Sequence, residues 1–139
     1  MSQDGISNPT KARMRPETLA EVAELTLKGS SFDLCLKNFL DGFYASPKPQ
    51  ALETEPPRLH AAQGELGLVR DAYLAAVAES LGSHASIRTP DWAYADDRKL
   101  KHPWFALEYP SLRAILLWES PPAFRSRNLF VSENALSRV

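Results

Sequence analysis

The chain has 139 residues, of which 44% are hydrophobic and 24% charged, and its formal net charge is −1 at pH 7. This length suits one domain, and this composition is that of a globular protein, which excludes a wholly disordered chain or a fibrous repeat. No apolar stretch approaches the roughly 18 residues of a membrane-spanning helix, and residues 1–17 lack the apolar centre of a secretory signal. Since Cys35 is the single cysteine, no internal disulfide can form, and we expect a cytoplasmic protein.

The apolar residues predict a mainly α-helical fold. Leucine and alanine together number 37, against 8 isoleucine and valine residues. Unbranched side chains lose little rotamer freedom in a helix, whereas β-branched side chains favour strands. We therefore expect a flexible N-terminal tail over residues 1–15 and a compact single-domain helical bundle over residues 16–139. The C-terminal half of that bundle is predicted to be loop-rich and aromatic.

Two amphipathic helices are predicted at the start of the domain. The first opens at Pro16, because proline fits the first turn of a helix, and ends at Gly29. The second is capped by Ser30 or Ser31 and has the clearest helical spacing in the chain. The apolar faces comprise Leu19, Val22, Ala23 and Leu27 in the first helix, and Phe32, Cys35, Leu36, Phe39, Leu40 and Phe43 in the second.

A proline-rich connector separates this pair from a third helix. Residues 46–57 contain four prolines, which remove backbone donors and disfavour helix in the residue before each of them. The third helix is predicted from about Glu65 to Leu81, and Gly82 is expected to end it. Its apolar stripe comprises Leu66, Val69, Tyr73, Val77 and Leu81.

Shorter elements are predicted in the rest of the chain. The sequence favours a short helix near Asp91–Ala95, a solvated turn over residues 96–99 and an extended segment over residues 128–131. Residues 111–119 fit either a buried strand or a helix. The helix is favoured by the spacing of three apolar residues that would share one face, namely Leu112, Ile115 and Leu116.

Charge is distributed unevenly along the chain. Residues 1–97 hold 9 Lys/Arg and 14 Asp/Glu, a balance of −5, whereas residues 98–139 hold 7 and 3, a balance of +4. A basic end on an acidic body can mark a surface for an anionic partner, either nucleic acid or an acidic protein. The alternative is that the arginines pair internally, with Arg113, Arg125 and Arg127 facing Glu108 and Glu119.

The same C-terminal part concentrates the aromatic side chains. All three tryptophans lie within 27 residues, together with neighbouring tyrosine and phenylalanine residues. Such a cluster either forms the core between short helices or, beside arginine, provides a protein–protein interface. The candidate partner-binding residues are Trp104, Arg113, Arg125 and Arg127.

The sequence contains no catalytic or metal-binding motif. It has no G-x-S-x-G elbow, no glycine-rich phosphate loop and no H-E-x-x-H, so we expect no catalytic residue, no cofactor and no metal site. The candidates for a small enzyme are an acidic group and one histidine, namely Asp91, Asp96, Asp97 and His102. Turn and cap chemistry is the simpler explanation of those carboxylates.

The first two helices have the outline of a helix-turn-helix motif. The Gly-Ser-Ser turn between them is as short as that motif requires. The second helix, however, offers only Lys37 and Asn38 as obvious base-reading side chains, whereas a recognition helix normally presents several. An ordinary helical hairpin is the simpler interpretation, and nucleic-acid binding through this pair or the basic C-terminus is the alternative function.

Several short motifs of the chain are shared with a known family. They are DGFYASP at 41–47, EPP at 55–57, Pro90-Asp91-Trp92, Pro103-Trp104-Phe105, Leu112-Arg113-Ala114, residues 119–125 (ESPPAFR) and Arg127-Asn128. Through these motifs, residues 30–139 resemble an uncharacterised family of short bacterial proteins. Members of this family are similar to the small partners of nucleotidyltransferase-like proteins, in gene pairs that look like toxin–antitoxin modules. The resemblance implies an antitoxin-like, partner-binding role and assigns no catalytic residue to this chain.

These observations together predict a non-enzymatic protein that binds a partner, in the first place another protein. A nucleotidyltransferase-like partner is implied by the resemblance alone. Apolar helical faces are also typical of chains that form homodimers, and no membrane contact is expected.

Overall fold

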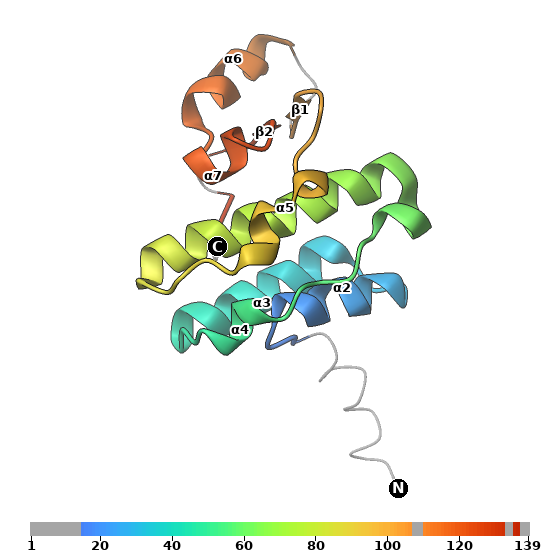
Figure 1. The fold of residues 1–139 in the computed structure, drawn as a ribbon. Coiled ribbons are helices and arrows are strands. Elements are labelled where there is room, and N and C mark those ends of the chain that lie inside the picture. The colour runs from blue at the N-terminus through green and yellow to red at the C-terminus, as the bar shows by residue number, and fades with distance from the viewer. Residues whose placement is uncertain (1–14, 107–109, 133–134, 137–139) are drawn as a thin grey trace, which may run out of the picture. The chain divides into compact units, whose positions relative to one another are not determined.

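The computed structural model describes residues 15–106, 110–132 and 135–136, and these residues are mainly helical, with two short strands (Figure 1). The predicted mainly α-helical class is therefore confirmed. The chain divides into two compact units, one ending at Pro57 and the other beginning at Arg58, at the end of the proline-rich connector. The tail expected over residues 1–15 lies, except for Arg15, outside the described residues. One domain over residues 16–139 stays a prediction.

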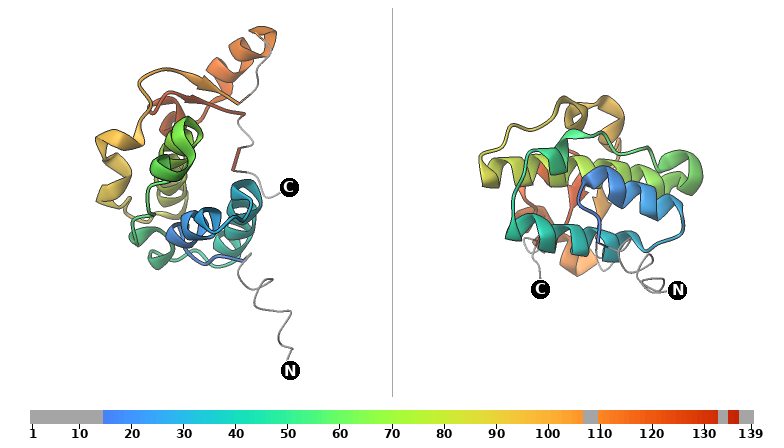
Figure 2. Two further views of the ribbon diagram at one scale, coloured as in Figure 1. Left: turned by 90° about the vertical axis from the view of Figure 1, so that its right-hand side faces the viewer. Right: turned by 90° about the horizontal axis from the view of Figure 1, so that it is seen from below.

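The first unit contains helices α2 (Leu19–Leu27), α3 (Phe32–Ala45) and α4 (Gln50–Glu53). Helices α2 and α3 lie side by side (Figures 1 and 2). Helix α2 begins at a capping box, in which Thr18 Oγ1 accepts the N–H of Glu21 at 3.0 Å and the Glu21 carboxylate accepts the N–H of Thr18 at 3.2 Å. The predicted start at Pro16 is therefore wrong by a few residues, because the cap that accepts an N–H of the first turn is the hydroxyl of Thr18.

Helix α3 follows its sequence pattern closely. Ser31 is the N-cap, and its hydroxyl oxygen accepts the N–H of Leu34 at 3.2 Å. All six of the predicted apolar residues are buried: Phe32, Cys35, Leu36, Phe39, Leu40 and Phe43. On α2, by contrast, Leu27 is 43% exposed although it was expected on the buried face. The connector is not wholly irregular either, since α4 lies within it and buries Ala51 and Leu52.

The second unit is built around the long helix α5 (His60–Ala85), which is interrupted by a kink at Gly64. Around it lie two turns of 3₁₀ helix, η1 (Asp91–Tyr94) and η2 (Asp96–Arg98), and the short helices α6 (Pro110–Glu119) and α7 (Pro122–Arg125). Strands β1 (Trp104–Phe105) and β2 (Leu129–Phe130) pair in parallel, with Trp104 opposite Leu129 and Phe105 opposite Phe130. Helix α5 packs against η1, η2, α7 and β2.

Helix α5 differs from its prediction in both its ends and its exposure. Gly82 lies inside the helix rather than at its end. Glycine is needed at this position because a Cβ would come within 2.7 Å of the Ile87 carbonyl oxygen. Ser86 instead provides the left-handed cap, with φ of 57°. The predicted stripe is wrong at Leu66, which is 49% exposed, whereas the alanine-rich middle of the helix is buried almost all round.

Three of the secondary-structure predictions for the C-terminal part of the chain are confirmed. A short helix forms at 91–94, residues 111–119 are helical rather than extended, and a strand forms at 129–130. The face predicted for α6 is wrong at Ile115, which is 48% exposed; the Leu112 side chain lies outside the described residues. The turn at 96–99 is not wholly solvated, because the Arg98 side chain is fully buried. In the described part of the chain, no helix is both long and apolar enough to cross a bilayer.

Candidate partner-binding surface

Arg127 lies in the interior of the second unit. Its side chain is 3% exposed, and Nη1 lies 2.6 Å from the Glu79 carboxylate on α5. The same guanidinium donates to the carbonyl oxygens of Ala123, at 2.7 Å, and Ala93, at 2.8 Å. These bonds join α7 and η1 to α5, and they occupy both terminal nitrogens of the guanidinium with contacts inside the unit. Arg127 is therefore withdrawn from the predicted partner-binding set, and its internal partner is Glu79 rather than Glu119.

A second buried arginine, Arg98, occupies a neighbouring part of the same unit. Its guanidinium lies over the Trp92 ring at 4.8 Å and donates to the carbonyl oxygen of Asp71 at 3.0 Å. The buried carboxylate of Asp71 accepts the backbone N–H of Leu59 at 2.7 Å. Burial raises the pKa of Asp71, against the lowering effects of the Leu59 N–H and of the Arg98 charge. Arg98 and Trp92 thus hold η1 and η2 on α5.

Arg113, in contrast, is exposed on α6 and stacks on an aromatic side chain of β1. Its guanidinium carbon lies 5.1 Å from the centroid of the Phe105 ring. On the neighbouring strand, the Phe130 ring stacks with that of Phe105 at a centroid distance of 5.0 Å. The stack places a fixed cation beside an aromatic side chain that is only partly buried.

Helix α6 is fastened at one end by Ser120, which is 1% exposed. The Ser120 hydroxyl oxygen accepts the N–H of Val131 at 2.8 Å and lies within hydrogen-bond distance of the carbonyl oxygens of Leu116 and Val131. Leu116 is buried, and the principal contact of α6 is with β2. The helix is therefore attached along one side and extends away from α5 (Figures 1 and 2).

The flanks of α6 carry large exposed apolar side chains. Ile115 is 48% exposed and Leu117 is 49% exposed. Because a helix turns by about 100° per residue, Leu117 lies near Arg113 on one flank and Ile115 lies on the opposite flank. We call the residues Phe105, Arg113, Ile115 and Leu117 the α6 surface. It combines apolar and aromatic area with one arginine, the composition that binding surfaces favour.

The two other predicted residues lie at different places in the unit. Trp104 is half-buried, and its backbone N–H donates to the carbonyl oxygen of Asn128. Because side chains alternate along a strand, its side chain faces the side opposite Phe105. Arg125 is exposed on α7, and its Nη2 donates to the carbonyl oxygen of Ser120 at 2.6 Å. The structure therefore brings Arg113 to the α6 surface, and it does not gather the four predicted residues at one point.

Two of the acidic residues near η1 and η2, Asp91 and Asp97, pair with arginines. Asp91 pairs with Arg88 at 3.2 Å, and Asp97 receives two hydrogen bonds from Arg58, at 2.8 and 2.9 Å. The hydrogen bonds from Arg58 hold the pKa of Asp97 below its usual value. Among the described residues, no group of three or more His, Cys, Asp or Glu side chains is arranged to hold a metal ion.

The two buried arginine contacts could not be predicted from the sequence. Glu79 lies 48 residues before Arg127, and Asp71 lies 27 residues before Arg98, so neither pairing follows from local spacing. The exposure of Leu117 was also missed, although its position four residues after Arg113 predicts that both share one side of the helix.

Comparison of the chain with protein-family models, with curated proteins and with solved structures found no match.

Proposed function

We propose that this chain is a non-enzymatic protein that binds another protein through the α6 surface. The main support for this proposal is that Ile115 and Leu117 are half-exposed on α6, a helix whose principal contact within its unit is with β2. A short helix attached on one side can enter an apolar groove of a partner, with side chains from both flanks in contact. Burial of that area on binding would supply the main favourable term.

Charge favours a partner whose groove has acidic residues at its rim. The guanidinium of Arg113 is held over Phe105, so a carboxylate can meet it with little further loss of side-chain freedom. Arg125, exposed one helix further on, is a second cation on the same unit. Such rim contacts set specificity and association rate more than affinity.

The family resemblance described above supports a nucleotidyltransferase-like protein as the partner. In that pair, this chain would be the antitoxin-like member, and the α6 surface would be the element that docks on the larger protein. No observation on the described residues specifically favours the alternative, nucleic-acid binding. Two of the seven C-terminal basic residues are buried, which weakens the basic surface that the sequence predicts.

The test is capture of the partner by single-residue variants of the α6 surface. The purified chain serves as bait in an extract of its host, with a nuclease-treated extract in parallel. A captured protein is identified by mass spectrometry, purified and titrated. We expect Ile115→Asp and Leu117→Asp each to weaken binding about tenfold or more. The reason is that losing an apolar contact at the centre of an interface costs about 2 kcal/mol or more of binding free energy.

Leu66→Asp is the matched control, since Leu66 belongs to the same unit and is also 49% exposed. It should bind as the unchanged chain does, and all three variants should keep the same melting temperature. Equal loss in Leu66→Asp, or full binding by Leu117→Asp, contradicts the proposal. Capture of nucleic acid alone, lost on nuclease treatment, supports the alternative function, and light scattering of the bait shows whether a second copy of the chain occupies the surface.

A further inference from the structure

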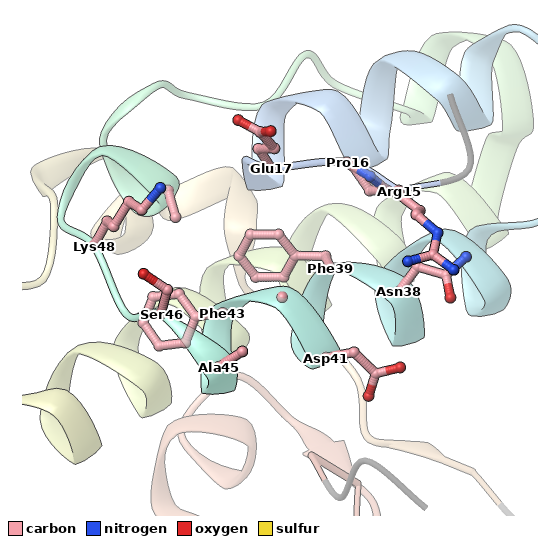
Figure 3. Close-up of a pocket in the computed structure, with 12 residues that line it drawn as sticks. Arg15, Pro16, Glu17, Asn38, Phe39, Asp41, Phe43, Ala45, Ser46 and Lys48 are labelled. Atoms are coloured by element: carbon pink, nitrogen blue, oxygen red, sulfur yellow. The ribbon is translucent and has the colours of Figure 1, made fainter. Parts of the chain in front are cut away.

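A pocket of about 470 Å³ lies beside helix α3 in the first unit, and its lining favours no class of ligand (Figure 3). Arg15 and Lys48 lie on opposite sides of Phe39, and two acids of the lining, Glu17 and Asp41, match their charge. The Phe39 ring is 1% exposed, so it offers almost no surface to a bound molecule. The structure supports a further inference at another place, where the second unit begins.

The second unit begins with a short segment that is separate from the long straight part of helix α5. We call residues 58–63 the strap; it comprises Arg58, Leu59 and the first turn of α5. The Gln63 N–H closes this turn by donating to the Leu59 carbonyl oxygen at 2.9 Å. The helix is broken after it, because Gly64 has φ of 62° and ψ of −135°. Glycine is the residue that adopts such angles readily, so Gly64 is a natural hinge.

One buried carboxylate holds the strap on its inner side. Asp71, on the straight part of α5, is 1% exposed and accepts the N–H of Leu59 at 2.7 Å and the N–H of His60 at 3.3 Å. The Leu59 carbonyl oxygen lies so close to Gly67 that a Cβ on that glycine would be 2.3 Å from it. The inner contacts are therefore close, but they involve the backbone of only two consecutive residues.

Side-chain contacts hold the strap on its outer side. The Arg58 guanidinium donates to both oxygens of the Asp97 carboxylate, at 2.8 and 2.9 Å. Arg70 Nη1 donates to the Gln63 side-chain oxygen at 2.9 Å. The Arg58 and Asp97 side chains are 33% and 62% exposed, so water competes for their hydrogen bonds. Residues 60–62 are exposed, and within the strap the Leu59 side chain is the buried one.

We propose that the strap opens and closes on helix α5 independently of the rest of the second unit, with Gly64 as its hinge and Asp71 and Asp97 as its two attachment points. Local opening is favoured where few buried apolar contacts are lost, and the strap gives up one buried leucine together with bonds that water can replace. Opening would add residues 58–63 to the proline-rich connector. The strap therefore sets the length of the chain between the two units, whatever binds at the α6 surface.

Trypsin cleavage after Arg58 measures this opening. In the closed strap the bond to Leu59 is protected, because the Leu59 N–H is held by the buried Asp71 carboxylate and the Leu59 side chain is fully buried. The one other basic residue of the connector region, Lys48, is followed by proline, before which trypsin does not cleave. The full chain is digested, and the fragment that begins at Leu59 is quantified by mass spectrometry.

Cleavage after Arg70, inside helix α5, is the measure of wider unfolding. We expect cleavage after Arg58 to be faster by about tenfold or more, because local opening is more frequent than unfolding of the unit. Urea separates the two processes further, since its effect scales with the surface exposed. Addition of 1 M urea should raise cleavage after Arg70 by about tenfold and cleavage after Arg58 by less than about twofold.

Variants of the hinge and of the outer attachment test the device itself. Gly64→Ala should speed cleavage after Arg58 by about tenfold, because alanine does not readily adopt the φ of 62° that the closed strap requires. Gly42→Ala is the matched control, since Gly42 has no positive φ and a Cβ there would meet no heavy atom within 4 Å. Asp97→Asn should speed cleavage by about two- to fivefold, the scale of an exposed ion pair, whereas Asp96→Asn should not.

Two results overturn the proposal. The first is cleavage after Arg58 and Arg70 at the same rate and with the same urea dependence, which shows that the strap opens only when the unit unfolds. The second is unchanged cleavage in Gly64→Ala, provided that circular dichroism shows a folded variant; if it does not fold, unchanged cleavage in Asp97→Asn decides in the same way. Because no partner is present in this assay, its outcome is separate from that of the α6 surface.

Discussion

Replacing Arg127 with methionine tests whether this arginine serves the fold rather than a partner. Methionine keeps much of the length of the side chain and removes its charge and all of its hydrogen bonds. In the unchanged protein those bonds reach the Glu79 carboxylate and the carbonyl oxygens of Ala93 and Ala123. The substitution therefore leaves one partly buried carboxylate without its cation and two carbonyl groups without this donor.

The expected loss follows from the burial of the pair. Removing one partner of a buried ion pair costs about 3–5 kcal/mol. Two features place Arg127 at the lower end of this range. The Glu79 side chain is 31% exposed and can regain water, and Arg127 Nε is buried with no hydrogen-bond partner among the described residues, which already costs free energy in the unchanged protein. We expect a loss of about 3 kcal/mol in the free energy of unfolding.

Urea unfolding, followed by far-ultraviolet circular dichroism, measures this loss. With a denaturant slope of about 1.5 kcal/mol per molar, the midpoint should fall by about 2 M. Arg125→Met is the matched control two residues away, since the Arg125 side chain is exposed and, among the described residues, makes one hydrogen bond, to the Ser120 carbonyl oxygen. Its midpoint should change by less than about 0.7 M, because one such bond contributes about 1 kcal/mol.

A double-mutant cycle with Glu79→Gln separates the ion pair from the two carbonyl bonds. The coupling energy should be favourable, because the double variant should lose less free energy of unfolding than the sum of the losses in the two single variants. If Arg127→Met unfolds at the same urea concentration as Arg125→Met and yet no longer captures the partner, the reasoning is refuted, and Arg127 belongs to the binding surface.

Three further outcomes are expected from buried positions of the second unit. Gly67→Ala should lower the urea midpoint by the equivalent of about 1–3 kcal/mol, because its Cβ would lie 2.3 Å from the Leu59 carbonyl oxygen; an unchanged midpoint contradicts that close approach. Ser120→Ala removes the acceptor of the Val131 N–H and should cost about 1–3 kcal/mol, with faster hydrogen exchange at that amide; unchanged exchange shows that the bond does not hold α6. Burial raises the pKa of Asp71 in the folded protein above its ordinary value of 3.8. The protonated carboxyl therefore stabilises the fold fully below pH 3.8, and this stabilisation is lost as the pH rises through the higher pKa of the folded state. As the pH rises through this range, the melting temperature of the unchanged chain should therefore fall relative to that of Asp71→Asn. A relative increase in melting temperature would contradict a raised pKa of Asp71.

Local signals explain the parts of the fold that the sequence predicts. Helix α3 has a serine cap and six apolar residues at helical spacing, and all of these features act within a few turns of the chain. The helical state of residues 111–119 was favoured for the same reason. Spacing alone, however, shows which residues share a face and not whether another element covers that face. This explains why Leu27, Leu66 and Ile115 are exposed although each lies on a predicted apolar stripe.

Charged residues are the second limit of sequence-based prediction. The run from Asp96 to Lys99 is typical of a solvated turn, and three of its side chains are exposed. Arg98 is nevertheless fully buried, because Trp92 and the carbonyl oxygen of Asp71 receive its guanidinium. A buried arginine needs partners with the right geometry, and these are assembled by the tertiary fold from distant parts of the chain.

The burial of Arg98 and Arg127 changes what the basic C-terminus implies about the partner. Without these two residues, the surplus of +4 over residues 98–139 falls to +2. Binding to nucleic acid depends on the number of phosphates that exposed cations neutralise, so each buried arginine reduces both its affinity and its salt dependence. Apolar exposure on α6 is unaffected by this correction. The balance of the surface therefore moves from a basic face toward an apolar helix bordered by arginine, which suits a protein groove better than a phosphate backbone.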